Sequence, residues 1–232
     1  MIGVAVFTSA DGSPSDQGDY FSWFVSTSLV HHAKQLPEAD RNNFKALLVK
    51  DGIAPRDLDS LDVLARLAAS SHIDTLVTGT VETGPANYTI HVIVRRVPQG
   101  TLIVDKTTVI TRTEFTDSFS ETFPPKTDYP VLKAVGPNTA FDRGHAPQCI
   151  QCPQPEYNDA ARRDKIQGTA VFQVLISGEG DVVKVHPMKP LGYGLDEQAF
   201  EAIKRWRFRP ATRSDGSPVA VIVAVEVTFH LY

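Results

Sequence analysis

The chain has 232 residues, of which 42% are hydrophobic and 22% are charged, and its formal net charge is −4. These proportions are typical of a folded protein and argue against intrinsic disorder, and the charge gives no global reason to expect a nucleic acid or an anionic membrane as partner. No run approaches the roughly 20 apolar residues that span a bilayer, and no basic-then-apolar leader precedes the first apolar run, so we expect no membrane span.

The first half of the chain predicts alternating strands and helices. The apolar run from Val4 to Phe7 predicts a buried strand, and because it stands at the very start, we expect the natural protein to begin further upstream. After a turn, Ser15 or Asp16 could cap a first helix. The residues that recur on one face of this helix at helical spacing are Phe21, Phe24, Val25, Ser28 and Leu29.

Two further helices are predicted at 41–50 and 60–70, followed by three strands at 74–81, 88–97 and 101–110. The expected apolar stripe of the helix at 60–70 is Leu61, Leu64, Ala65 and Ala68. Within the strand at 74–81, Gly79 indicates either a β-bulge, which is the plainer interpretation, or close approach of a ligand. These elements predict an α/β, sandwich-like domain with one mixed sheet over residues 1–112.

Prolines without a sustained period mark residues 113–154 as a linker or wrapping arm: Pro124, Pro125, Pro130, Pro137, Pro147 and Pro153. The linker contains Cys149 and Cys152, the chain's two cysteines. The favoured interpretation is a structural disulfide or an inert pair. A zinc site and a redox pair are alternatives, although zinc normally takes four ligands and a redox pair normally begins a helix.

The last third, residues 155–232, has the clearest pattern. It predicts a short helix from 157 or 158 to 163, strands at 168–176 and 182–188 joined by a hairpin turn, and a helix at about 195–205. One face of the longer helix carries Leu195, Ala199, Ala202, Ile203 and Trp206. Basic residues at its end match the helix dipole better than a nucleic-acid site: Lys204, Arg205, Arg207 and Arg209.

The terminal strand alternates over an unusual length. Apolar residues occupy every second position: Val219, Val221, Val223, Val225, Val227, Phe229 and Leu231. A strand this long can leave an edge without a partner, and an open edge invites another strand.

Residues 155–232 resemble the C-terminal domain of the TonB family of energy-transducer proteins. The motifs that carry the resemblance are Pro155, Tyr157, Gly168, Leu195, Trp206, Phe208 and Pro210. The resemblance implies an antiparallel sheet with two helices, in which Trp206 and Phe208 anchor the end of the second helix and Pro210 stops it. Together with the first half, this gives an α+β protein of two domains.

The resemblance also implies a function. The family docks an extended peptide of an outer-membrane transporter by strand addition, here onto the edge of the terminal strand from Val219 to Phe229. We therefore expect a cell-envelope or periplasmic protein with no catalytic residue, no metal and no cofactor. Its partner would be an outer-membrane TonB-dependent transporter or another envelope protein, and the same edge could pair with itself in a homodimer.

The first domain more loosely resembles the N-terminal part of TolB and the curli and flagellar assembly proteins CsgG and FlgO. The residues that carry this resemblance are the run from Val4 to Phe7, Asp40-Arg41 and the run from Asp74 to Val81. Two alternatives to peptide docking follow. The chain could be a structural subunit of an envelope assembly, or its first domain could bind a ligand in a cleft near Thr8 to Gly12 while the second domain targets it.

Overall fold

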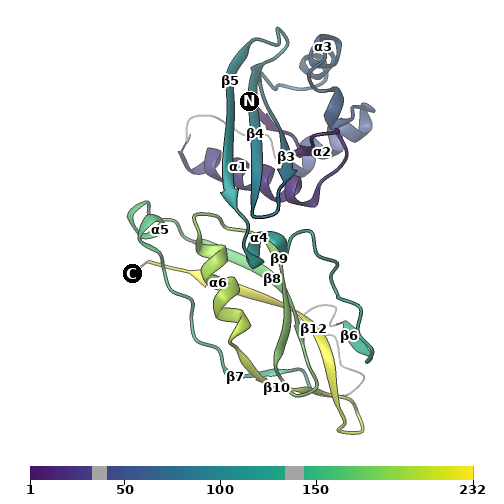
Figure 1. Ribbon diagram of the computed structural model, residues 1–232, viewed down its shortest axis with the longest axis vertical. Helices are drawn as coiled ribbons and strands as arrows, with labels where there is room; N and C mark the ends of the chain where they lie inside the picture. Colours follow the sequence, from purple (N-terminus) through teal and green to yellow (C-terminus); the bar gives the residue numbers. More distant parts are fainter. Residues whose placement is uncertain (33–40, 134–143, 232) are drawn as a thin grey trace. The chain divides into compact units, whose positions relative to one another are not determined.

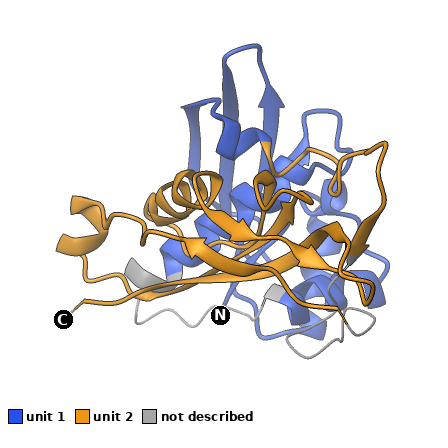
Figure 2. Ribbon diagram, turned by 90° about the horizontal axis from the view of Figure 1, so that it is seen from below, with its two compact units in different colours: residues 1–117 blue, residues 118–232 orange. Residues whose placement is uncertain are grey.

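The computed structural model describes residues 1–32, 41–133 and 144–231, so Pro137 of the predicted linker and Asp40 of the looser resemblance lie outside the described residues. The chain divides into two compact units, Met1–Asp117 and Ser118–Tyr232 (Figure 2). Both units combine helices with β-sheet, which confirms the α+β fold class.

The first unit contains one mixed sheet. Its strands are β1 (Ile2–Val4), β2 (Thr8–Ser9), β3 (Thr75–Thr83), β4 (Asn87–Arg96) and β5 (Leu102–Thr111). β1 and β2 run parallel to β3, whereas β3, β4 and β5 are antiparallel. The single strand predicted from Val4 to Phe7 is wrong. Three residues lie between Val4 and Thr8 but only two lie between their partners Val77 and Thr80, so pairing is interrupted between β1 and β2.

The helices of this unit are α1 (Asp16–His32), α2 (Arg41–Lys50), the 3-10 turn η1 (Pro55–Asp57), α3 (Leu61–Ser70) and α4 (Glu114–Asp117). Ser15 caps α1 as predicted, because its Oγ accepts a hydrogen bond from the Gly18 backbone at 3.0 Å. The predicted stripe is partly wrong, since Phe24 is 38% exposed while Gly18 and Ser22 are buried. A Cβ on Gly18 would lie 2.0 Å from the Phe7 carbonyl oxygen, so small residues let α1 approach the sheet closely.

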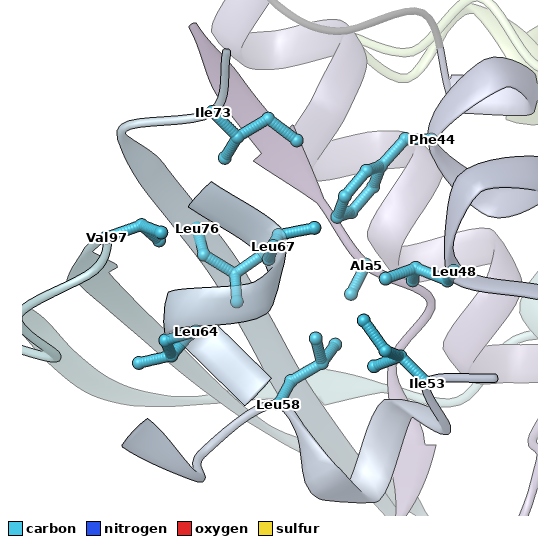
Figure 3. Packing of buried hydrophobic residues seen from close by; sticks show 10 residues of the cluster. All are labelled: Ala5, Phe44, Leu48, Ile53, Leu58, Leu64, Leu67, Ile73, Leu76 and Val97. Atoms are coloured by element: carbon cyan, nitrogen blue, oxygen red, sulfur yellow. The ribbon is translucent and has the colours of Figure 1, made fainter. Parts of the chain in front are cut away.

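Helices α2 and α3 pack against the sheet and enclose an apolar cluster with it (Figure 3). From α3 this cluster takes Leu64 and Leu67, whereas the predicted Leu61 is 61% exposed and Ala65 is exposed. The buried face of α3 is therefore rotated from the predicted one. The cluster consists of Ala5, Phe44, Leu48, Ile53, Leu58, Leu64, Leu67, Ile73, Leu76 and Val97.

The second unit contains a larger and a smaller sheet (Figure 1). Its strands are β6 (Val131–Lys133), β7 (Gln148–Gln151), β8 (Gly168–Ile176), β9 (Val182–Lys189), β10 (Arg207–Arg209), β11 (Ala211–Thr212) and β12 (Pro218–Phe229). The larger sheet has the antiparallel order β11-β12-β8-β9, and β7 pairs with β10. The sequence predicted an antiparallel sheet. The structure differs in one pair of strands, because β6 joins β12 in parallel.

Two helices, α5 (Asp159–Arg163) and α6 (Leu195–Lys204), accompany this sheet. All residues of the apolar face predicted for α6, from Leu195 to Trp206, are buried. The helix lies against β9. The role predicted for Pro210 is wrong, because α6 ends at Lys204 and Pro210 lies between β10 and β11. Trp206 and Phe208 do anchor the segment after the helix, with both side chains 9% exposed and their ring centres 6.2 Å apart.

Residues 118–133, which end with β6, cover the face of the sheet that carries Leu175, Ala220 and Ile222, and we call them the arm. Phe123 and Val131 of the arm pack on these three residues. The Phe123 ring stacks on His186 with ring centres 5.2 Å apart, and Glu121 forms an ion pair with Lys184. The arm explains why the first half of β12 is buried on both faces.

Candidate functional site

The edge of β12 facing away from β8 is the candidate site. β8 pairs with β12 from Val221 to Phe229 on one edge. On the other edge β11 pairs with Pro218 and Val219, and β6 pairs from Ala220 to Ile222. The edge that we expected to be open from Val219 is therefore occupied as far as Ile222. From Val223 to Phe229 no strand of the described ranges pairs with it, and we call residues 223–229 the open edge.

Side chains along the open edge alternate between the two faces. Val227 and Phe229 are buried on the helix side, whereas Ala224, Glu226 and Thr228 are exposed on the other. The Thr228 hydroxyl lies 3.0 Å from that of Thr169 on β8. Because the side chains point to the two faces, the outward-facing backbone groups are what the edge itself offers to a partner.

A cavity of about 520 Å³ adjoins the C-terminal half of the open edge. One side is formed by residues 226–230, and the other by the extended segment at Gln154, Pro155 and Tyr157 together with Trp206. We call it the edge pocket. Its volume lies within the range of about 300–1,000 Å³ that is common for ligand sites. Three residues of the TonB-like motif set, Pro155, Tyr157 and Trp206, therefore line a cavity beside the predicted docking strand.

The segment that faces the open edge is fixed by a covalent bond and a hydrogen bond. The predicted disulfide is confirmed, since Cys149 and Cys152 are bonded, with 6.0 Å between their Cα atoms. Cys149 lies on β7 opposite Phe208 of β10. Directly after the disulfide, Trp206 donates a hydrogen bond from Nε1 to the Pro153 carbonyl at 3.0 Å. These contacts join the start of this segment to the end of α6.

Tyr157 forms an aromatic contact with the docking strand. Its ring meets that of Phe229 edge to face, with ring centres 5.6 Å apart. Its hydroxyl is buried and has no hydrogen-bond partner in the part of the chain that the structure describes, and burial raises its pKa. The next residue, Asn158, caps α5 by accepting from the Ala161 backbone at 2.8 Å, and donates to the Tyr193 carbonyl at 2.6 Å. Asn158 thereby holds Tyr157 in place.

The start of α6 holds a buried carboxyl group. Asp196 is 1% exposed and accepts hydrogen bonds from the backbone of Leu191 at 2.7 Å and Gly192 at 2.6 Å. Burial raises the pKa of Asp196 to about 7, against the opposing effect of these two hydrogen bonds. Gly168 of the motif set lies nearby, where a Cβ would come within 2.6 Å of Leu191. These contacts fix the loop before Leu195, so we assign them a structural role.

The first unit has a cavity of about 310 Å³ at the place where the alternative function puts a cleft. It is lined by residues 8–12, by Arg56 and Asp59, and by β3 and β4. The pKa of Asp11 is lowered by hydrogen bonds from Ser13, which is the behaviour of an exposed turn. The bulge predicted at Gly79 is wrong, because the β3–β4 register runs through it without a shift. A Cβ there would lie 2.9 Å from the Phe7 ring, so Gly79 makes room for Phe7.

The basic residues after α6 contact the protein itself. Arg205 donates to the Glu201 carbonyl, Arg207 pairs with Asp181 at 3.0 Å, and Arg209 donates to Gln148. Among the residues that the structure describes, no three His, Cys, Asp or Glu side chains are grouped to hold a metal ion. None of the described helices is both long enough and apolar enough to cross a membrane.

Sequence reasoning missed four residues of the site. The edge pocket is also lined by Gln154, Glu226, Thr228 and His230, which belong to no motif. The alternation of the terminal strand placed Glu226 on its polar face, which was the one available signal.

Comparisons with known proteins agree on the second unit. Residues 153–231 match the family described as Gram-negative bacterial TonB protein C-terminal. Protein TonB of Vibrio cholerae is 35% identical over 79 residues, which are 34% of this chain and 32% of that protein. Protein tonB2 of Pseudomonas aeruginosa is 38% identical over 64 residues, which are 27% of this chain and 24% of that protein. The chain thus spans a third or less of these relatives.

Among solved structures, the solution NMR structure of the Pseudomonas aeruginosa TonB CTD covers 46% of this chain and 99% of its own, at 17% sequence identity and a TM-score of 0.31. The matches to the family and to these two relatives identify residues 153–231 as a TonB-like C-terminal domain.

Proposed function

We propose that this protein is a cell-envelope docking protein whose second unit binds an extended segment of a partner by strand addition to the open edge of β12. The observation that carries the proposal is the position of that edge. Within a domain of TonB-like sequence, residues 223–229 have no partner strand among the described residues, and the edge pocket lies beside them. In this mode the main chain provides affinity and alternate side chains provide selectivity.

The partner and the location follow from the same likeness. We propose a periplasmic setting and, as partner, an outer-membrane TonB-dependent transporter or another envelope protein. No chemistry is part of the proposal, because the open edge acts through backbone groups. In this account residues 155–232 form the docking domain and residues 1–112 form a separate α/β domain. Residues 113–154 connect them and also contribute α4 to the first unit and β6 and β7 to the sheets of the second.

Within the docking strand, we assign the binding role to Val223, Val225, Val227 and Phe229. Of the residues predicted from the sequence, Val221 is paired on both strand edges, and Val219 is paired with Ala211 on the edge that faces away from β8. These two residues therefore support the site and do not contact the partner directly.

An amide NMR titration of the full chain tests this proposal. The probes are extended peptides from the N-termini of the host's own outer-membrane transporters, and scrambled peptides of the same composition are the control. The expected result is chemical-shift change concentrated at residues 223–229 and in the Gln154–Tyr157 segment. Binding with shifts confined to the first unit would contradict the proposal.

A second candidate, an assembly subunit, is favoured by the outer strand of the first unit. β5 is at the end of its sheet and exposes several apolar side chains, among them Leu102 at 53% and Val109 at 60%. An exposed apolar edge strand is a template for pairing with another chain. Sedimentation of the wild type and of a Val109→Lys variant tests this candidate. Assembly subunits would self-associate, and the lysine would weaken the association.

A further inference from the structure

The edge pocket offers different chemistry to the two faces of an incoming strand. On the helix side it presents the rings of Tyr157, Trp206 and Phe229, and on the opposite side it presents Glu226 and Thr228. In an added strand, residues opposite one another across the pair point to the same face, and successive residues alternate. The two surfaces would therefore be contacted by alternate residues of one bound segment.

The segment across the pocket from β12 offers fewer main-chain partners to an incoming strand than the open edge does. Pro153 and Pro155 have no backbone N–H, and the Pro153 carbonyl already accepts the Trp206 indole hydrogen bond. A bound segment would therefore form its ladder with β12 alone, and the Gln154–Tyr157 segment would contact its side chains. In this arrangement the open edge provides affinity, and the edge pocket provides selectivity.

Glu226 gives the open edge a charge preference. It is exposed, its partner on β8 is Val171, and no cation of the described residues forms an ion pair with it. A residue added opposite Glu226 would thus be its nearest charged neighbour across the strand pair. Opposite charges at such positions stabilise a strand pair, and like charges destabilise it.

We propose that the open edge selects an extended peptide segment in which apolar and polar residues alternate. An aromatic or branched apolar side chain faces the rings of Tyr157 and Phe229, and a lysine or arginine lies opposite Glu226. This inference rests on the proposed function, to which it adds the chemistry of the bound segment.

Three synthetic peptides test the inference with the full chain. Each has nine residues that alternate valine with threonine, and the central polar position is lysine, threonine or glutamate. Isothermal titration gives the dissociation constants, and amide NMR shifts locate binding. We expect the lysine peptide to bind about fivefold more tightly than the glutamate peptide, since a cross-strand charge pair contributes up to about 1 kcal/mol. Replacing the valines of the lysine peptide by alanine should weaken binding at least tenfold, because each valine loses apolar contact area.

Charge reversal on the protein supplies the decisive comparison. Glu226→Lys should invert the order of the charged peptides, and Glu226→Gln should abolish their difference. Glu179→Lys is the matched control, because it makes the same charge change on an exposed residue of the β8–β9 turn, and it should leave the order unchanged.

The outcomes separate the two levels of the account. If all three peptides shift residues 223–229 but bind equally well, or if Glu226→Lys leaves their order unchanged, the selectivity inference is overturned while the proposed function stands. If no peptide shifts the open edge, docking by strand addition fails, and the inference fails with it.

Discussion

Replacing Asp196 with asparagine tests whether the start of α6 holds a neutral carboxylic acid. Asp196 is 1% exposed and has two backbone N–H donors, from Leu191 and Gly192. Burial favours the protonated form, whereas the two donors favour the carboxylate. Burial prevails and raises the pKa of Asp196 to about 7, so the group is protonated in the folded unit at mildly acidic pH.

The sign and size of the effect follow from linkage. Between pH 4 and pH 7 the folded state binds a proton that the unfolded chain has released, so the free energy of unfolding falls as pH rises. Moving the pKa from its ordinary 3.8 to about 7 corresponds, at about 1.36 kcal/mol per pH unit, to about 4 kcal/mol in total. About 3 kcal/mol of this change should fall between roughly pH 4.5 and 7.5.

Urea unfolding at several pH values measures this effect. The chain has two tryptophans, so a Trp23→Phe background makes fluorescence report on Trp206 and on the second unit. The variant cannot titrate at position 196, so the free energy of unfolding of the wild type minus that of Asp196→Asn should fall as pH rises. A difference that is constant, or that rises with pH, would refute the reasoning and would mean that the two N–H donors keep Asp196 ionised.

Three other substitutions test the contacts around the site. Tyr157→Phe removes a buried hydroxyl without a partner and should raise the free energy of unfolding by about 1 kcal/mol, measured in urea; a clear loss would show that the hydroxyl is hydrogen-bonded. Phe123→Ala should cost about 1–2 kcal/mol and speed amide hydrogen exchange at Ala220–Ile222, because the arm loses its stack on His186; unchanged exchange there would argue against the arm as a fixed element. Replacing Cys149 and Cys152 with serine removes a disulfide that closes only a short loop, because the two residues are three positions apart. The free energy of unfolding in urea should therefore fall by roughly 2 kcal/mol or less, and a loss of about 5 kcal/mol would contradict this estimate.

The sequence predicted those parts of the second unit that repeat with one period. The bounds of β8 and the buried face of α6 match their predictions, because α6 presents one apolar face to one core and β8 does so from Ala170 to Val174. The alternation of β12 holds from Val223 onward, where its second face is exposed. It fails at Ala220 and Ile222, which are also buried, because the arm covers that face.

The contacts of the arm could not be predicted from its sequence. Its prolines remove backbone donors and leave no period, so the sequence predicted a linker or a wrapping arm without saying which. In the structure Phe123 and Val131 pack on the sheet and β6 pairs with β12. The contacts that make it part of the sheet join residues far apart in the chain, such as Glu121 with Lys184. The occupied half of the docking strand was missed for the same reason.

In the first unit, two of the errors concern which helix face is buried. The pattern favoured large residues such as Phe24, but α1 turns its small residues, Gly18 and Ser22, toward the sheet. Helical spacing fixes the period of a stripe but not its phase when apolar residues surround the helix. The backbone approach at Phe7 decides the phase, and that contact is not local in sequence.

The measurement that most directly tests strand addition at the open edge uses backbone-methylated peptides. Two versions of one binding peptide carry N-methyl groups on alternate residues, so that one version blocks the amides facing β12 and the other blocks the amides facing away. Because a strand uses every second amide toward its neighbour, we predict that one version loses binding and the other keeps it. Equal binding by both versions would contradict main-chain docking at residues 223–229.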